Sequence, residues 1–521
     1  MSPQQIALKS TTSRMLKLLV QGAGINFLGY ASIMILNLTF QLLLARMLNS
    51  EEFGTFALAF SITNIALLFG CFGIEGGMVK YIALYTGNND KARLVGTIVS
   101  GGLIVGVSCL VTMVFFLGFT SMLVDRIYSA PNLKSILYIM TASVPFGVFT
   151  IFFLSVTQGF KRMEYRVVIE KVAVPFLKIV GVAAFFAILG RGVIQATYAI
   201  LIASIIGAVL SFFSVLHLRP NFAHNQRPAL IVRDLAGFSC YLMIADVTGR
   251  LWQDLPTLFL GSQIDSIQAG VYFLVMKIAG ILTVFMTVFS PIFTPIMAGL
   301  YGQQDFMQFE KLLKTVTRWG YMFSLPATMM LLIFSEELLR LINPAYVTGS
   351  AILRIVIFMQ LINVATGPLG WVLVMSGHPR LHLLNSVSSL ALSLVLAFFL
   401  IPRYGIMGAT LTSFLGMVFY TLLCLVEVYK ILRIHPFSTS FFKPTAAILL
   451  SVTSASCIYL VLPSLKIADR LGISGLVLVI SYGVILVVLR LDADDQFVFN
   501  ALRNRLSSLA RVLGTGAEDY K

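Results

Sequence analysis

The feature that most constrains this chain is a series of long apolar segments that recurs from one end to the other. An α-helix of about 20 mostly apolar residues crosses the roughly 30 Å hydrocarbon core of a bilayer. Fourteen segments meet this requirement, so we expect fourteen membrane-spanning helices. Their expected bounds are 20–45, 53–76, 94–118, 136–158, 168–190, 193–217, 236–260, 270–298, 319–341, 350–375, 383–401, 405–429, 445–464 and 471–490.

Composition supports lipid as the solvent. The 521 residues are 58% hydrophobic and 11% charged, whereas soluble domains carry roughly 25% charged residues. The connections between the segments are short, which leaves no room for a soluble domain. The first 17 residues are polar, and the apolar run that follows is a full span without a signal-peptide cleavage site. We therefore predict an all-α polytopic membrane protein.

The basic residues orient the chain. With the N-terminus in the cytoplasm, 24 Lys and Arg residues fall on the cytoplasmic side and eight on the other. Because short cytoplasmic loops are enriched in Lys and Arg, both termini are predicted to be cytoplasmic. The net charge of +15 therefore indicates orientation, and no nucleic-acid partner is expected.

An internal repeat divides the chain. Leu42–Phe60 (LLLARMLNSEEFGTFALAF) and Leu258–Met276 (LFLGSQIDSIQAGVYFLVM) lie 216 residues apart, and Gly54 aligns with Gly270. Asn49-Ser50 aligns with Asp265-Ser266. Similar offsets relate QGFKR to SGHPR and AFFAILGRGVIQAT to AFFLIPRYGIMGAT. Two copies of six spans have parallel topology and a pseudo-two-fold axis along the membrane normal, which predicts two lobes around a central cleft.

The repeat and the charge pattern together predict six regions. These are a basic cytoplasmic N-terminal segment (1–19), an N-lobe of helices 1–6 (20–217), a cytoplasmic inter-lobe loop (218–235), a C-lobe of helices 7–12 (236–430), helices 13 and 14 (431–492), and a basic cytoplasmic tail (493–521).

The seventh segment carries most of the intramembrane charge. Asp246, Arg250 and Asp254 are spaced i, i+4 and i+8, which places them on one face of a helix. One interpretation is a self-compensating ion-pair stripe that makes the helix insertable. We favour a face that lines a wet cavity, because charge inside a bilayer usually faces a bundle interior or water. Pro256 follows and is expected to open the backbone.

Three further basic residues lie within predicted spans. Lys277 is about two turns into the eighth span, near enough to pair with Asp254. Lys178 is at the middle of the fifth, after Pro175. Arg354 is one turn into the tenth, where its side chain could instead reach the outer surface. Phosphate fits such guanidinium and ammonium donors, so the sequence predicts an anion-binding cavity lined by Arg250, Lys277, Lys178 and Arg354, with Asp246 and Asp254 as candidate ion-coupling residues.

Catalytic and metal-dependent classes lack their motifs. The chain contains no GxxxxGK[ST], HExxH or GxSxG. Its five cysteines are scattered in apolar runs, which gives neither a CxxC pair nor a disulfide framework. We expect a transporter with no catalytic residues, no metal and no cofactor.

Several segments resemble polysaccharide exporters of the O-antigen flippase type. They are LLLARMLNSEEFGTFALAFSITNI, FGIEGGMVKYIA, DLPTLFLGSQIDSIQAGVYFLVMKIAGIL, INPAYVTGSAILRI and IPRYGIMGATLTS, and the resemblance covers about residues 20–430. It implies two six-helix lobes with two extra helices, in the superfamily that also holds multidrug antiporters and lipid II flippases. Asp254 and Lys277 match positions where members often carry charge, whereas Arg250 and Lys178 rest on the residue argument alone.

The resemblance also implies a substrate and a setting. A polyprenyl-pyrophosphate-linked oligosaccharide would be moved across the bacterial inner membrane by alternating access, with membrane lipids, a polysaccharide polymerase and a chain-length regulator as partners. A cation-coupled multidrug exporter is the alternative, but it should have a cleft of net negative charge. A membrane polymerase or glycosyltransferase is less consistent with the sequence, because no loop is large enough to hold its chemistry.

Overall fold

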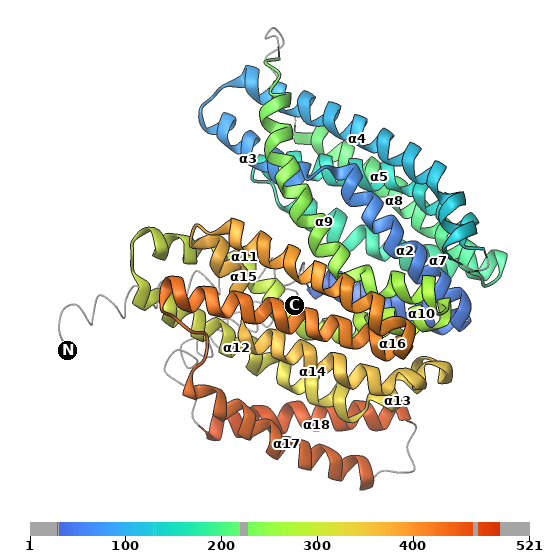
Figure 1. Cartoon of the computed structure of the whole chain (residues 1–521), viewed down its shortest axis with the longest axis vertical. Coiled ribbons are helices and arrows are strands. Elements are labelled where there is room, and N and C mark those ends of the chain that lie inside the picture. The colour runs from blue at the N-terminus through green and yellow to red at the C-terminus, as the bar shows by residue number, and fades with distance from the viewer. Residues whose placement is uncertain are drawn as a thin grey trace, which may run out of the picture.

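The computed structural model describes residue 29 and residues 31–128, 130, 132–218, 228–461 and 467–489. Helices joined by short turns make up this part of the chain, and it contains no strand. Figure 1 shows two helical bundles that approach each other where α2 (Ser50–Cys71) and α10 (Ser266–Ala279) meet. The predicted fold class, an all-α polytopic membrane protein, is confirmed.

The first bundle holds the elements that precede residue 219. In chain order they are helix Ala31–Met47, α2, α3 (Ile74–Gly87), α4 (Lys91–Arg126), α5 (Leu133–Gly159), α6 (Glu164–Arg166), the π-helix η1 (Val167–Ala173), α7 (Val174–Leu189) and α8 (Val193–Leu218). α9 (Val232–Gln263) then runs from this bundle toward the second one (Figure 1).

The second bundle holds the remaining elements. They are α10, η2 (Gly280–Thr283), α11 (Val284–Gly302), α12 (Phe306–Ile333), α13 (Ser335–Ile342), η3 (Pro344–Gly349), α14 (Ser350–Thr366), α15 (Leu369–Met375), α16 (Pro379–Leu432), η4 (Thr439–Phe441), α17 (Phe442–Val461) and α18 (Ile467–Val488). Helices α17 and α18 pack on each other and on α12 through a core of their own. They form the outermost layer of this bundle in Figure 1.

Every predicted span overlaps a helix, but the count of fourteen is not confirmed. Within the described residues, nine helices are long and apolar enough to cross a membrane, or ten if the pair α12 and α13, bent by 74°, is one span. Helix Ala31–Met47 is too short to qualify, and residues 20–28 of the predicted first span lie outside the described residues. So do the N-terminal segment, half of the inter-lobe loop (219–227) and the C-terminal tail.

The prolines disturb the helices less than the sequence suggested. The prediction that Pro256 opens the backbone is wrong, because α9 continues through it to Gln263. Pro145 and Pro326 also lie inside continuous helices. The described break within α16 is instead at Gly405, whose φ of 54° only glycine adopts readily. It separates the two spans that the sequence predicted there.

The two repeated turns begin equivalent helices. Asn49 is the N-cap of α2 and accepts a hydrogen bond of 2.8 Å from the Glu52 amide. Asp265 is the N-cap of α10 and accepts one of 2.6 Å from the Gln268 amide. Short polar side chains at this position satisfy amides that a helix leaves unpaired. The aligned Asn49-Ser50 and Asp265-Ser266 therefore mark the same feature in both copies of the repeat, the beginning of a helix.

The aligned glycines meet where α2 crosses α10. A Cβ atom on Gly270 would lie 2.7 Å from the Gly54 Cα, and a Cβ atom on Gly54 would overlap the main-chain carbonyl of Ser266. Phe53 packs edge-on against Phe273, with 6.3 Å between the ring centroids. We call this close crossing the α2–α10 seam. It closes the space between the bundles on the side predicted to be periplasmic.

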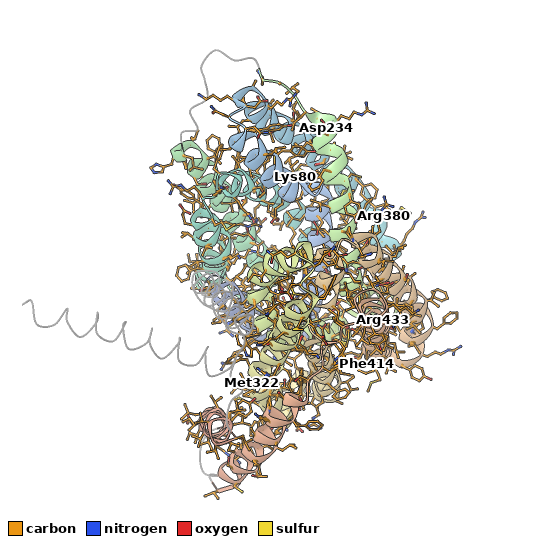
Figure 2. The ribbon with its side chains drawn as sticks, turned by 90° about the vertical axis from the view of Figure 1, so that its left-hand side faces the viewer. Lys80, Asp234, Met322, Arg380, Phe414 and Arg433 are labelled. Carbon is orange, nitrogen blue, oxygen red and sulfur yellow. The ribbon has the colours of Figure 1, made fainter. Side chains whose placement is uncertain are left out.

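The segment just before α9, and with it the N-terminal end of this helix, is fixed to the first bundle. The Ala229 amide donates to the Ala92 carbonyl at 3.1 Å, and the Ile231 amide donates to the Ser100 hydroxyl at 3.0 Å. Figure 2 shows Lys80 and Asp234 together at the end of this bundle that lies farthest from α17 and α18. Helix α9 therefore joins the two bundles: its start packs on α3 and α4, and it also packs on α16.

Candidate functional site

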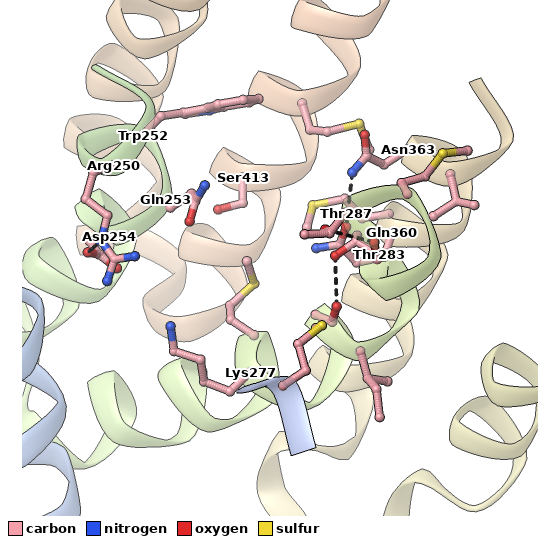
Figure 3. A pocket seen from close by; sticks show the side chains of 18 of the residues that line it. Arg250, Trp252, Gln253, Asp254, Lys277, Thr283, Thr287, Gln360, Asn363 and Ser413 are labelled. Carbon is pink, nitrogen blue, oxygen red and sulfur yellow. Dashed lines mark hydrogen bonds and ion pairs between the residues drawn. The ribbon is translucent and has the colours of Figure 1, made fainter. Parts of the chain in front are cut away.

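A cavity of about 1100 Å³ lies between the bundles. Its walls come from helix Ala31–Met47 and α2 on one side, from α10, α11, α14 and α16 on the other, and from α9, which crosses between them. Figure 3 shows charged side chains on one side of this pocket and neutral polar side chains on the other. The predicted central cleft corresponds to this cavity.

The charged side holds three of the predicted site residues. The Arg250 guanidinium pairs with the Asp254 carboxylate at 2.6 Å, within one turn of α9. The Asp254 side chain is only 5% exposed, so the pair leaves no free carboxylate. Lys277, half-buried on α10, lies 4.7 Å from the centre of the Phe273 ring. The expected Lys277–Asp254 pair is absent among the described residues, and Lys277 thus supplies the unbalanced positive charge.

Neutral polar side chains form the other side. Thr283, Thr287, Ser290 and Thr294 line the cavity at helical spacing along η2 and α11. Gln360 and Asn363 of α14 face them (Figure 3) and are joined by a hydrogen bond of 3.3 Å. Charge does not single out these neutral residues in the sequence. Their i, i+4, i+7 spacing was the signal available.

Aromatic rings also line the cavity. Trp252, Trp371 and Tyr420 line it, and the Trp252 and Tyr420 ring centroids lie 5.4 Å apart. Ser413 lies between the charged and neutral sides in Figure 3 and is held by a 2.6 Å hydrogen bond with the Tyr272 hydroxyl. Flat rings beside hydroxyl and amide groups suit a ligand with both apolar faces and polar edges.

The wall contributed by the first bundle has unsatisfied polar atoms. Gln41 and Asn64 line the cavity, and within the described part of the chain neither the Gln41 Oε1 nor the Asn64 Nδ2 atom has a hydrogen-bond partner. Buried polar atoms nearly always have partners in folded proteins. These two therefore mark a place where water or a ligand group completes the site.

Three predicted site residues lie elsewhere. Lys178 is half-buried in α7 and does not line the cavity. Arg354 is exposed on α14, outside the cavity, and donates to the Ser335 hydroxyl at 2.8 Å. Asp246 is exposed on α9, two turns before Asp254, and is also absent from the lining. The structure does not bring Lys178 and Arg354 into the lining of this cavity, because spacing shows depth in the membrane but not which helix face points inward.

Other charges at the spans pair away from the cavity. Arg166 contacts Glu75 at 2.5 Å and Glu170 at 2.7 Å, which links α3 to the start of the fifth predicted span. Glu427 accepts a hydrogen bond of 2.6 Å from the Asn385 amide. Among the described residues, no group of three or more His, Cys, Asp or Glu side chains is placed to hold a metal ion.

Several solved structures share this fold. A lipid II flippase, MurJ, in an inward closed conformation superposes with a TM-score of 0.68 at 15% identity, covering 89% of this chain and 98% of that one. An inward-facing multidrug resistance MATE family transporter gives 0.67 at 14%, covering 78% and 98%. A Pyrococcus furiosus MOP-superfamily transporter, described as having a binding pocket of reverse polarity, gives 0.61 at 15%, covering 81% and 96%. The chain is a multi-pass membrane protein with the fold of the MOP-superfamily transporters.

Family models identify the chain more closely. The model described as polysaccharide biosynthesis protein matches residues 19–301, and the MatE model matches residues 243–399. The first match covers more than half of the sequence, and the chain belongs to the polysaccharide biosynthesis protein family. No curated protein sequence matches it.

Proposed function

We propose that this protein is a flippase that moves polyprenyl-pyrophosphate-linked oligosaccharides from the cytoplasmic to the periplasmic leaflet of a bacterial inner membrane. The observation that carries the proposal is the cavity between the bundles, which sets a cationic side against a neutral, hydroxyl-rich and aromatic side. Membership of the polysaccharide biosynthesis protein family supports it.

The cationic side fits the pyrophosphate. Lys277 and Arg250 are the cations that line the cavity within the described residues, and one carboxylate, Asp254, opposes them. Ammonium and guanidinium donors bind phosphate oxygens through charge-assisted hydrogen bonds. Because Arg250 is paired, Lys277 is the primary anion ligand, and Arg250 can share its remaining N–H groups with the substrate.

The neutral side fits the sugars. Hydroxyl and amide groups can donate and accept hydrogen bonds with sugar hydroxyls, and Thr287, Gln360 and Asn363 offer such groups across the cavity (Figure 3). Trp252 and Trp371 offer flat apolar faces. A neutral or weakly charged glycan is favoured, because no further cation among the described residues lines this side.

Transport requires the two bundles to exchange access to this cavity. The α2–α10 seam blocks the side predicted to be periplasmic, so substrate would enter from the cytoplasmic side and leave when the seam opens. A gradient-coupled step would involve Asp254 or Asp246, the candidate ion-coupling residues. Asp254 is paired with Arg250, so an ion could bind the Asp254 carboxylate at the step in which the two side chains separate.

A cation-coupled multidrug exporter is the second candidate, and the MatE match favours it. Its ligands would be cationic and would need a net negative cavity. Deletion of the gene distinguishes the two functions: a flippase mutant accumulates a lipid-linked oligosaccharide, which thin-layer chromatography and mass spectrometry of extracted lipids identify. A mutant that accumulates no such lipid but becomes sensitive to cationic drugs contradicts the flippase proposal.

Lys277→Met is expected to lower surface polysaccharide at least tenfold without lowering protein abundance. A charge-assisted hydrogen bond contributes about 1.5–3 kcal/mol. Lys277 contacts the Phe273 ring and has no ion-pair partner among the described residues, so its replacement leaves no buried carboxylate unpaired. Immunoblots of membrane fractions and quantification of surface polysaccharide provide the two readouts.

Lys178→Met is the matched control. It makes the same chemical change at another half-buried lysine of a predicted span, but outside the cavity lining. Its surface polysaccharide should remain near the wild-type level. Equal losses in both variants would show that any intramembrane lysine has this effect, and the cavity would lose its assigned role.

A further inference from the structure

A second, smaller pocket lies at the beginning of α12. Its volume is about 250 Å³, and it shares no lining residue with the large cavity. One face of α12 forms most of it, and the segment that leads from α16 to α17 closes the remaining side. The lining residues are Met307, Glu310, Lys311, Lys314, Thr315, Arg318 and Ser438.

Most of the charged side chains that line this pocket are basic. Three cations, Lys311, Lys314 and Arg318, face one carboxylate, Glu310, which pairs with Lys314 at 2.7 Å. The Arg318 side chain is buried, with 7% of its surface exposed. Several convergent cations around a hollow of this size suit a phosphate group.

The pocket is held in shape by contacts just beyond it. The Tyr321 hydroxyl forms a hydrogen bond of 3.1 Å with the Thr445 hydroxyl, and its ring lies 5.2 Å from the Phe441 ring. These contacts fix the start of α17 against α12, one turn past Arg318. Ser438 is therefore held opposite the basic face, and the pocket is a property of the packed fold.

The surroundings of the pocket are apolar and exposed. Phe306 and Met307 at the start of α12 are 42% and 73% exposed. Phe437 and Phe442, on either side of η4, are also exposed. Exposed apolar side chains beside a basic pocket, at the membrane end predicted to be cytoplasmic, are typical of the headgroup boundary, where anionic lipids attract Lys and Arg.

We propose that this pocket binds the phosphate headgroup of an anionic phospholipid, whose acyl chains lie against the exposed Phe and Met side chains. The bound lipid would join α12 to the segment before α17, and so tie the two added helices to the second bundle. This site is independent of the flippase function, since it uses none of the residues of the large cavity.

Binding can be measured with the purified full chain and phosphatidylglycerol as the probe. Native mass spectrometry of the protein in detergent, titrated with this lipid, gives its half-saturation concentration. Phosphatidylcholine, with equal acyl chains and no net charge, should bind weakly. Glycerol phosphate, the soluble headgroup, separates the two sources of phosphate: if it binds as tightly as the lipid, a free phosphate compound is the ligand and the lipid assignment is wrong.

Variants localise the binding. Lys311→Gln, at an exposed position, should raise the half-saturation concentration for phosphatidylglycerol about tenfold, since it removes one charge-assisted contact. Ser438→Trp fills the pocket without altering a charge and should have a similar effect. Lys430→Gln, at an exposed lysine near the end of α16, is the matched control and should bind as the wild type does.

The control residue Lys430 does not line the pocket. If Lys430→Gln weakens phosphatidylglycerol binding as much as Lys311→Gln does, the lipid is attracted by net charge alone. Wild-type binding in both Lys311→Gln and Ser438→Trp would also overturn the proposed site.

Discussion

Gly54→Ala is expected to prevent closure of the α2–α10 seam and to reduce transport strongly. A methyl group at Gly54 would overlap the Ser266 main-chain carbonyl, and no side-chain rotation can relieve contact with backbone. Overpacking of this kind costs about 1–3 kcal/mol, so the closed state should lose about five- to a hundredfold in population. The protein should then rest with the cavity open on the predicted periplasmic side.

A cysteine in the cavity reports this change. Thr287 is exposed and lines the cavity, so Thr287→Cys, in a variant lacking the five native cysteines, can be labelled by a membrane-impermeant maleimide added outside intact cells or spheroplasts. Labelling should increase in Gly54→Ala at unchanged protein abundance. Labelling and transport at wild-type levels would contradict the role of the seam.

Gly106→Ala is the control for this experiment. Gly106 lies within α4, and a Cβ atom there would meet nothing within 4 Å among the described residues. The substitution is chemically identical and also lies inside a predicted span. Labelling of Thr287→Cys and surface polysaccharide should both remain at the wild-type level, because Gly106→Ala affects no contact between the bundles.

The large-scale fold could be predicted because lipid imposes a simple rule. Every backbone polar group in the bilayer core must be satisfied within the chain, so each long apolar segment becomes a helix, and every predicted span overlaps one. The repeat gave more than topology. It aligned Gly54 with Gly270, and these residues contact each other across the interface between the bundles.

The positions of helix breaks could not be predicted as well. Pro256 was expected to open the backbone, yet α9 passes through it. Neighbouring helices in a membrane protein re-satisfy the carbonyl that a proline frees. The α2–α3 break occurs instead at Phe72 and Gly73, both with positive φ, and a Phe in that conformation gives no sequence signal.

The candidate site could be predicted in part. Three of the predicted residues line the cavity: Arg250, Asp254 and Lys277. They could be found in the sequence because they are charged and lie in the two helices where the second repeat begins. Lys178 and Arg354 satisfy the same criterion of depth but lie outside the lining. Sequence spacing gives the face of a residue relative to its own helix, whereas tertiary packing decides which face is turned inward.

The neutral half of the cavity could not be predicted from the charged residues of the sequence. Thr, Ser, Asn and Gln side chains cost far less than ions inside a bilayer, so a single one carries little information. Gln360 and Asn363 can be recognised as cavity residues only when the fold places α14 opposite α11 (Figure 3). A substrate with many hydroxyl groups is therefore the type that a sequence argument from charged residues alone would miss.

Arg250→Ala is expected to reduce both protein abundance and transport. It would leave the Asp254 carboxylate, 5% exposed, without its partner. Removing one member of a buried ion pair costs about 3–5 kcal/mol, which is sufficient to lower the folded fraction of a marginally stable membrane protein. The loss of transport in this variant alone therefore cannot distinguish a structural ion pair from a substrate ligand.

The paired substitution Arg250→Gln with Asp254→Asn makes that distinction. Two amides of similar shape can form a hydrogen bond to each other and leave no buried charge, so abundance in membrane fractions should return to near the wild-type level. Surface polysaccharide should nevertheless stay at least tenfold low, because the cavity has lost a guanidinium that contacts the pyrophosphate through a bond of about 1.5–3 kcal/mol.

The opposite result is equally informative. If the paired variant restores both abundance and polysaccharide, Arg250 and Asp254 form a self-compensating pair whose role is to let α9 enter the membrane, and Lys277 is left as the anion ligand. If it restores abundance alone, the charged pair itself is needed for transport, as a substrate ligand through Arg250 or as the ion-coupling site through Asp254. Because the paired variant leaves no buried charge without a partner, it separates the function of the Arg250–Asp254 pair from the stability of α9.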